Sequence, residues 1–279
     1  MNTRVAGAMS VALIWGHAAT AQSALLLRHE PVQDLRVRTV FQTVTRIDGV
    51  ERVVEAADLG VMSGVALAGL EGDLVWHLAY DSLIIRTREA IGEWSEFSVP
   101  GAESVWAQVH LDDRQRVSGV LHGEPVAGIT GLVGVLTGMP DLALPEGSLL
   151  AGETWSSKIT TEPLGVISTV GSVPELPAVA VLSQLTLDSI VVRANDTLGY
   201  VSVWGRVQPT SIVTINGEHP SRLTLSGTLS GNLVWSTGWS LFVSGARRMS
   251  LRMERGAAGV QSEKEIITVV KTTRHQIRP

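Results

Sequence analysis

The chain has no cysteine, few aromatic residues other than tryptophan, and no excess of basic charge. The lack of cysteine excludes disulfides, thiolate metal sites, cysteine nucleophiles and a lipid anchor attached through cysteine. A formal net charge of −5 at pH 7 leaves no basic face for binding nucleic acid. The 279 residues are enough for a sizeable hydrophobic core, and this core must supply the stability that disulfides would otherwise add.

Charge of either sign is also missing from a long run between Arg4 and Arg28. This run, residues 5–27, has about 23 residues. A helix of that length spans roughly 34 Å, which is enough to cross a bilayer. We therefore expect residues 1–27 to be a transmembrane anchor or a signal segment, the anchor contacting the lipid bilayer through residues 5–27. The positive-inside rule places the first residues in the cytoplasm and the bulk of the chain across the membrane.

The two interpretations of this segment predict different locations. Ala19-Thr20-Ala21 has the small-x-small pattern of a signal cleavage site, and cleavage after Ala21 would release a soluble periplasmic protein. Retention would leave the protein in a bacterial inner membrane with its bulk in the periplasm. The apolar run continues through Leu25-Leu26-Leu27, which a removable signal does not need, and this favours retention.

The following residues alternate in a way that predicts strands. In Leu35–Ile47 the odd positions are largely apolar or threonine and the even positions are mainly arginine and glutamine, and Asp48-Gly49 then signals a hairpin turn. Similar turn signals separate further strand-like runs. The predicted fold class is mainly β: an antiparallel meander forming a curled sheet, an open barrel or a sandwich. Three later runs exceed the usual strand length, and their predicted bend points are Gly227, Gly231 and Gly245.

Residues 125–143 interrupt this pattern. Four apolar residues follow helical spacing with glycines on the opposite face: Ile129, Leu132, Val133 and Leu136. The segment is predicted to be one short connecting helix, or a glycine-rich linker. It joins an N-terminal β half, residues 28–124, to a C-terminal β half, residues 144–279.

Several short landmarks resemble those of uncharacterised exported bacterial β-rich proteins. They are Leu144-Pro145-Glu146-Gly147, Gly152-Glu153-Thr154-Trp155, and the glycines at 227 and 231 before Trp235. Some proteins of that group resemble open, half-barrel lipoprotein carriers. The resemblance implies an architecture, and it brings no catalytic residues with it.

No catalytic or metal motif occurs in the chain, and we expect it not to be an enzyme and to require no cofactor. The nucleophile elbow, the phosphate-binding loop and the zinc-binding histidine pair are all missing. His17 stands out because it lies near the middle of the charge-free run, where an ionisable side chain is costly. Small residues surround it, so in a retained helix it could contact a tetrapyrrole or a neighbouring helix. In a cleaved signal it has no role.

Tryptophans on predicted strands and turns suggest an interaction surface. Aromatic side chains among polar neighbours are typical of partly buried protein interfaces. The candidates are Trp94, Trp106, Trp204, Trp235 and Trp239. The first functional hypothesis is a non-enzymatic accessory subunit of a bacterial membrane complex, such as a photosynthetic reaction-centre, antenna or respiratory assembly, whose other subunits it braces. The alternative is a soluble periplasmic carrier or binding protein for an apolar ligand.

Overall fold

The computed structural model describes residues 23–47, 50–66, 74–89, 92–98, 100–104, 106–111, 117–122, 142–161, 179–193, 195–216, 219–257 and 260–277. Its elements are β1 (Val32–Ile47), β2 (Val50–Ala66), β3 (Leu74–Glu89), β4 (Ser95–Ser98), the 3-10 turn η1 (Ala102–Ser104), β5 (Trp106–Leu111), β6 (Val117–His122), β7 (Thr154–Thr161), β8 (Val179–Arg193), β9 (Asp196–Asn216), β10 (His219–Ser236), β11 (Leu241–Ala257) and β12 (Val260–Gln276). The prediction of a mainly β fold is confirmed.

One antiparallel sheet contains all 12 of these strands, in the order β6-β5-β3-β2-β1-β12-β11-β10-β9-β8-β7, with β4 also paired to β3. From β1 in the middle of the sheet the chain winds out to one edge through β6, resumes at the other edge with β7 and winds back. The first and last strands therefore pair, from Val37 opposite Gln276 to Ile47 opposite Ile266. The predicted N-terminal and C-terminal halves join through this pairing into one sheet. The described strands thus form an open sheet rather than a sandwich.

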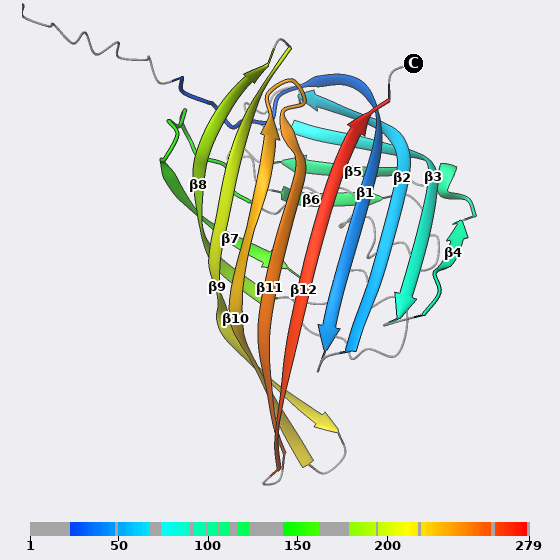
Figure 1. Ribbon diagram of the computed structural model, residues 1–279, viewed down its shortest axis with the longest axis vertical. Coiled ribbons are helices and arrows are strands. Elements are labelled where there is room, and N and C mark those ends of the chain that lie inside the picture. The colour runs from blue at the N-terminus through cyan, green and yellow to red at the C-terminus, as the bar shows by residue number, and fades with distance from the viewer. Residues whose placement is uncertain are drawn as a thin grey trace, which may run out of the picture.

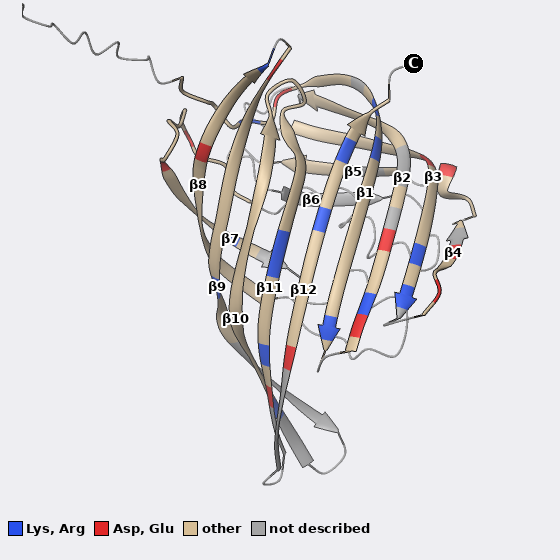
Figure 2. Ribbon diagram, viewed as in Figure 1, with Lys and Arg blue, Asp and Glu red and all other residues tan. Residues whose placement is uncertain are grey.

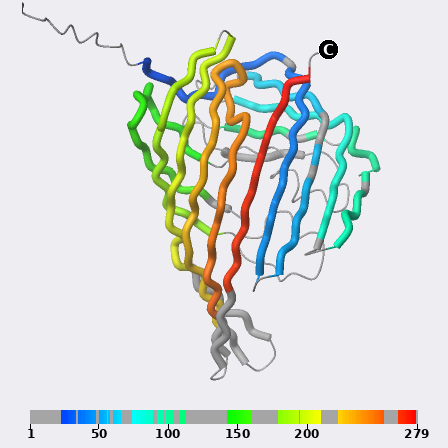
Figure 3. The backbone as a smooth tube through the Cα atoms, viewed as in Figure 1, coloured from blue at the N-terminus to red at the C-terminus, as the bar shows by residue number. Residues whose placement is uncertain are grey.

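The sheet is strongly curled. Both of its edges bend to the same side, so β5, β6 and β7 lie behind the long central strands (Figure 1 and Figure 3). The long runs expected near the C-terminus are strands of 18, 17 and 17 residues in β10, β11 and β12. Strands of this length accumulate a large twist, which gives the sheet one concave and one convex face.

The strand alternation assigns side chains to the two faces. In β1, Val37, Phe41 and Thr43 are buried on the concave face, whereas Arg36 and Arg38 are exposed on the convex face. Charged residues recur along the central strands (Figure 2). Several of them form exposed ion pairs, including Arg36 with Asp81 at 2.9 Å and Arg86 with Glu96 at 2.6 Å. Such pairs add little stability, so the apolar concave face holds the fold together.

Two of the predicted bend glycines lie on β10, where a neighbouring strand comes very close. A Cβ at Gly227 would lie 2.1 Å from the carbonyl oxygen of Ser250, and one at Gly231 would lie 2.4 Å from that of Ala246. Gly227 also follows a register shift between β10 and β9. Only glycine allows the backbones to approach this closely.

The end of the charge-free run is part of the folded domain. Buried and exposed residues alternate from Leu25 to Glu30, and Leu25 pairs with Leu149 in an isolated β-bridge whose N–H···O distances are both 2.8 Å. Leu25 and Leu27 are buried in the core. We call residues 23–31 the strap. Two of the three leucines that favoured a retained anchor therefore have a second explanation, as core residues that the folded domain needs with or without cleavage, whereas Leu26 is exposed.

Other sequence expectations fall outside the described part of the chain. Residues 1–22, with the proposed membrane or signal helix and His17, are among them, and so are residues 125–141 of the proposed connecting helix. Within the described ranges, no helix is long and apolar enough to cross a membrane. Leu142 and Leu144, at the end of that connector and just after it, have no regular secondary structure and are buried.

Candidate functional site on the concave face

Two apolar clusters line the concave face. The first draws on β1, β2, β3 and β5 and contains Trp76, Leu78 and Val109. The second draws on β7 to β12, the strap and residues 142–144, and contains Leu185 and Trp235. Both clusters form because every second side chain of a strand points to the concave face, and most of these side chains are apolar. The concave face is thus apolar at both ends, as in curled sheets and barrels that enclose an apolar ligand.

A polar strip separates the clusters along the middle of this face. Thr43 and Thr45 on β1 and Thr268 on β12 are buried, and Thr45 lies opposite Thr268 in the ladder. The hydroxyls of Thr43 and Thr45 have no hydrogen-bond partner among the residues that the structure describes. A buried polar group without a partner costs roughly 1–3 kcal/mol, so it needs a reason to be there.

Two arginines point into the same strip from β11 and β12. Arg274 is 6% exposed and its Nη1 donates a hydrogen bond of 2.5 Å to the carbonyl oxygen of Phe242. Arg247 is half-buried, next to the buried Met249 on the same face, and burial lowers the pKa of its guanidinium. The side chain still keeps its charge near neutral pH. A positive charge therefore lies on a face that is otherwise apolar or hydroxylic.

These arginines share a cavity. It opens to solvent, and its enclosed part is small, with room for about one water molecule. Its lining combines two apolar side chains, two hydroxyls, a glycine and both guanidinium groups: Leu233, Phe242, Ser244, Gly245, Arg247, Thr272 and Arg274. In the ladder Gly245 lies opposite Thr272, two residues from each arginine along its own strand. Arg247 and Arg274 therefore lie on either side of the Gly245–Thr272 pair, in which Gly245 contributes no side chain.

The strap closes one end of the concave face. Its His29 is buried and lies between Trp76 of the first cluster and Trp235 of the second, with ring centroids 6.3 and 5.1 Å away. Burial lowers the pKa of His29 to about 4, and a hydrogen bond to the Ser240 backbone opposes this more weakly. The strap thus connects the two clusters through one neutral imidazole.

The predicted interface tryptophans do not form one group. Trp94, Trp106 and Trp204 are 43%, 42% and 50% exposed, whereas Trp235 is fully buried and Trp239 packs partly buried against the first cluster. Trp235 is a core residue, because a side chain without exposed surface cannot contact a partner. The part of the chain that is described also holds no group of three or more histidine, aspartate or glutamate residues placed to bind a metal.

The landmarks of the family resemblance have structural roles. The Trp155 indole donates to the carbonyl oxygen of Ala143 at 3.0 Å, and Ser157 Oγ accepts from the Ala143 amide at 2.9 Å. Gly152 has a φ of 92°, which favours glycine. These contacts fix the segment before β7 against the second cluster.

Sequence reasoning missed the inward arginines, although a signal for them exists. Arg247 and Arg248 are adjacent on a predicted strand, and adjacent side chains on a strand point to opposite faces. One of the two must therefore lie on the inner face of a half-buried sheet. In the structure Arg248 is the exposed one.

Comparison with known proteins leaves the family open. No protein-family model matches the chain, and no curated protein is significantly similar to it. Among solved structures, the crystal structure of the β domain of the Bordetella autotransporter Brka aligns with 86% of this chain and 98% of that chain. The TM-score is 0.23 and the sequence identity is 10%. A likeness this low carries no argument about this protein.

Proposed function

We propose that this protein is a non-enzymatic carrier or binding protein that holds an apolar ligand against the concave face of its sheet. The observation that supports this best is the open cavity between β10, β11 and β12, which lies where the apolar second cluster meets the polar strip. Small-molecule sites combine an apolar wall with a few polar groups, and Leu233 and Phe242 supply the apolar wall here. Location in the periplasm is part of the proposal.

A titration with the uncharged fluorescent probe N-phenyl-1-naphthylamine tests this function. We expect saturable binding to the full chain. Leu233→Trp would fill the cavity and weaken binding, whereas Leu182→Trp, at a 54% exposed position on β8, is the matched control and leaves binding unchanged. Saturable binding that both variants retain equally would move the ligand away from this cavity, and absence of binding to the unmodified chain would refute the function.

A second candidate is the accessory subunit of a membrane complex, and the convex face favours it. Trp204 on β9 is half exposed, with the Arg206 guanidinium 5.3 Å from its ring centroid. The exposed Leu182 lies on the neighbouring strand, directly opposite Arg206 and diagonal to Trp204. Tryptophan and arginine are the residues that most often dominate protein interfaces.

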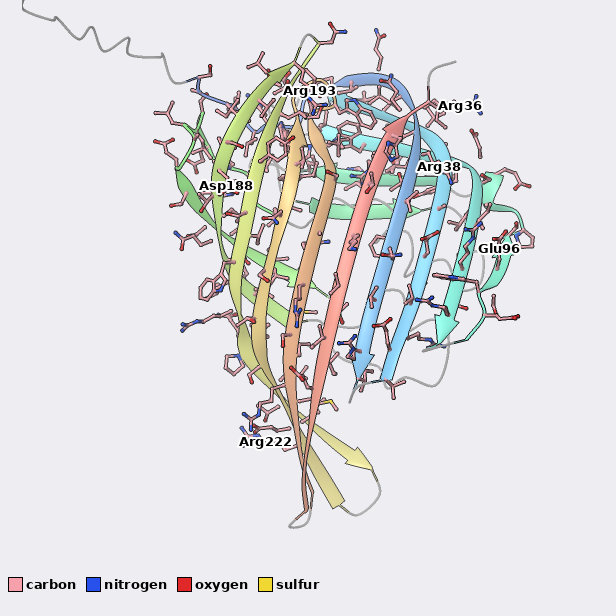
Figure 4. All side chains as sticks on the ribbon, in the orientation of Figure 1. Arg36, Arg38, Glu96, Asp188, Arg193 and Arg222 are labelled. Carbon is pink, nitrogen blue, oxygen red and sulfur yellow. The ribbon has the colours of Figure 1, made fainter. Side chains whose placement is uncertain are left out.

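Trp94 repeats the pairing on the other half of the sheet, with Arg88 5.1 Å from its ring centroid. Figure 4 labels Glu96, of the adjoining β4, on that side of the molecule, and Asp188 on the side of β8. Under this second proposal these convex-face sites contact neighbouring subunits. The membrane anchoring itself depends on residues outside the described ranges.

A further inference from the structure

The Arg247 guanidinium is the most unusual charge in the structure. It forms no ion pair and no hydrogen bond with any residue in the described ranges, although it lies half-buried on the concave face beside the buried Met249. Exposed arginines on the convex face, such as Arg36 and Arg46, have carboxylate partners at 2.9 Å. Removing a charge from water without a partner is costly, and an arginine on an inner face is normally paired.

A purely structural role does not account for this placement. Solubility does not need a charge on the concave face, because Arg248 on the same strand already supplies one to the convex face. Packing alone would be served better by an apolar side chain such as the adjacent Met249. The charge becomes favourable when an anion enters the cavity and pairs with it.

The cavity has the composition for one end of an amphiphile. Arg247 and Arg274 supply N–H donors, the Thr272 hydroxyl lies between them in the ladder, and Leu233 and Phe242 form an apolar wall. Arginine forms strong, charge-assisted hydrogen bonds with carboxylate and phosphate oxygens. The cavity is an open hollow whose enclosed part has room for about one water-sized group, so it receives the anionic oxygens of a head group and leaves the hydrocarbon chain outside.

We infer that Arg247 and Arg274 bind the anionic oxygens at the end of an amphipathic ligand, whose hydrocarbon chain lies outside the cavity, beyond its open mouth. This inference rests on the proposed carrier function and narrows its ligand class to chains ending in a carboxylate or a phosphate. Arg247 supplies the unpaired charge. Arg274, already fixed by its bond to the Phe242 carbonyl, supplies a positioned second guanidinium.

The test compares a charged probe with its neutral derivative. cis-Parinaric acid is a fluorescent long-chain carboxylate, and its methyl ester has the same chain without the charge. We expect the full chain to bind the acid at least tenfold more tightly than the ester, as one or two charge-assisted hydrogen bonds imply. Competition of the bound acid by dodecanoate and by dodecyl phosphate then identifies which oxyanion the site prefers.

Three variants locate the effect. Arg247→Met keeps the length of the apolar stem and should lower acid affinity about tenfold while ester affinity stays constant. Arg247→Lys should restore part of the preference. Arg248→Met is the matched control on the convex face and should change neither affinity. If Arg247→Met does not fold, two measurements still test the anion site. They are the ratio of acid to ester affinity in the unmodified chain and the same ratio in Arg274→Met.

The outcomes separate this inference from the function on which it rests. Equal affinity of the unmodified chain for acid and ester overturns the anion site and leaves the apolar carrier intact. A preference for the acid that Arg247→Met and Arg274→Met both retain also overturns it. Failure of both acid and ester to bind refutes the carrier function itself.

Discussion

The imidazole Nδ1 of His29 lies 2.6 Å from the carbonyl oxygen of Ser240, 211 positions further along the chain. Because a carbonyl oxygen only accepts, Nδ1 carries the proton and donates it. Ser240 has a φ of 51° in the turn between β10 and β11, so the bond joins the strap to a constrained turn. Together with the two tryptophans that contact the ring, this bond holds the strap over the end of the concave face.

This arrangement predicts that stability falls in mild acid. The pKa of His29 is about 4 in the folded chain and its ordinary value is 6.5. Between these values the unfolded chain binds a proton that the folded chain does not, so the free energy of unfolding decreases as pH falls from about 6.5 to 4. Above pH 6.5 the contribution is constant. The pKa difference corresponds to a loss of roughly 3 kcal/mol.

Urea denaturation at several pH values checks this prediction. His29→Asn keeps an N–H donor near the Ser240 carbonyl and does not titrate. Carboxylates elsewhere affect both proteins equally, so the difference between wild type and variant isolates His29. We expect this difference to change by about 3 kcal/mol between pH 7.5 and pH 4. Parallel stability curves for the two proteins across this range would contradict the assignment of a buried, neutral His29.

A second prediction concerns Asp196, whose carboxylate holds the β10–β11 turn. It accepts hydrogen bonds from Ser236 Oγ at 2.6 Å and from the Gly238 amide at 2.8 Å, and Thr237 Oγ1 donates at 3.2 Å. Asp196→Ala should lower the free energy of unfolding by about 2 kcal/mol, because the three donors at Ser236, Thr237 and Gly238 would lose their charged acceptor. Thermal denaturation measures this.

Asp188→Ala is the matched control for that experiment. The Asp188 carboxylate is exposed and accepts a bond of 2.9 Å from Ser202 Oγ. We expect its removal to change stability by less than about 0.5 kcal/mol. Equal losses at the two positions would mean that the Asp196 bonds do not fix the turn.

A third prediction uses the close approach of β10 and β11. Gly231→Ala would place a Cβ 2.4 Å from the Ala246 carbonyl oxygen, and backbone cannot move aside as a flexible side chain can. We expect a destabilisation of about 1–3 kcal/mol. Gly147→Ala is the control, because a Cβ there meets nothing within 4 Å. If chemical denaturation shows no difference between the two variants, the strands are further apart than described.

Strand periodicity predicts the local structure of this protein well. The alternation in β1 places Thr39, Phe41 and Thr43 on one face, and the structure buries all three. The pattern works because an exposed convex face and an apolar concave face impose opposite preferences on neighbouring residues. The pairing of β1 with β12 could not be predicted in this way, because a period of two does not identify which strand lies alongside.

Two features were hidden for physical reasons. The charge-free run predicts a membrane helix that continues through Leu27. In a short stretch where every residue is apolar, however, periodicity cannot distinguish the end of a helix from a buried strand-like segment. Leu25 and Leu27 belong to the second kind. The cavity depends on long-range register, since Arg247 and Arg274 are brought together only by the pairing of β11 with β12.

The last prediction concerns the convex face and tests the second candidate function. In the isolated chain, acrylamide should quench Trp204, which is 50% exposed, and should not reach the fully buried Trp235. Trp204→Phe should therefore reduce the quenchable part of the fluorescence, whereas Trp235→Phe should not. If the protein is a subunit that docks through this face, the effect of Trp204→Phe should disappear when the chain is measured within its detergent-solubilised membrane assembly. The same effect in both preparations would leave Trp204 exposed in the assembly and would remove the main support for a subunit role, because an interface residue loses its solvent contact on binding.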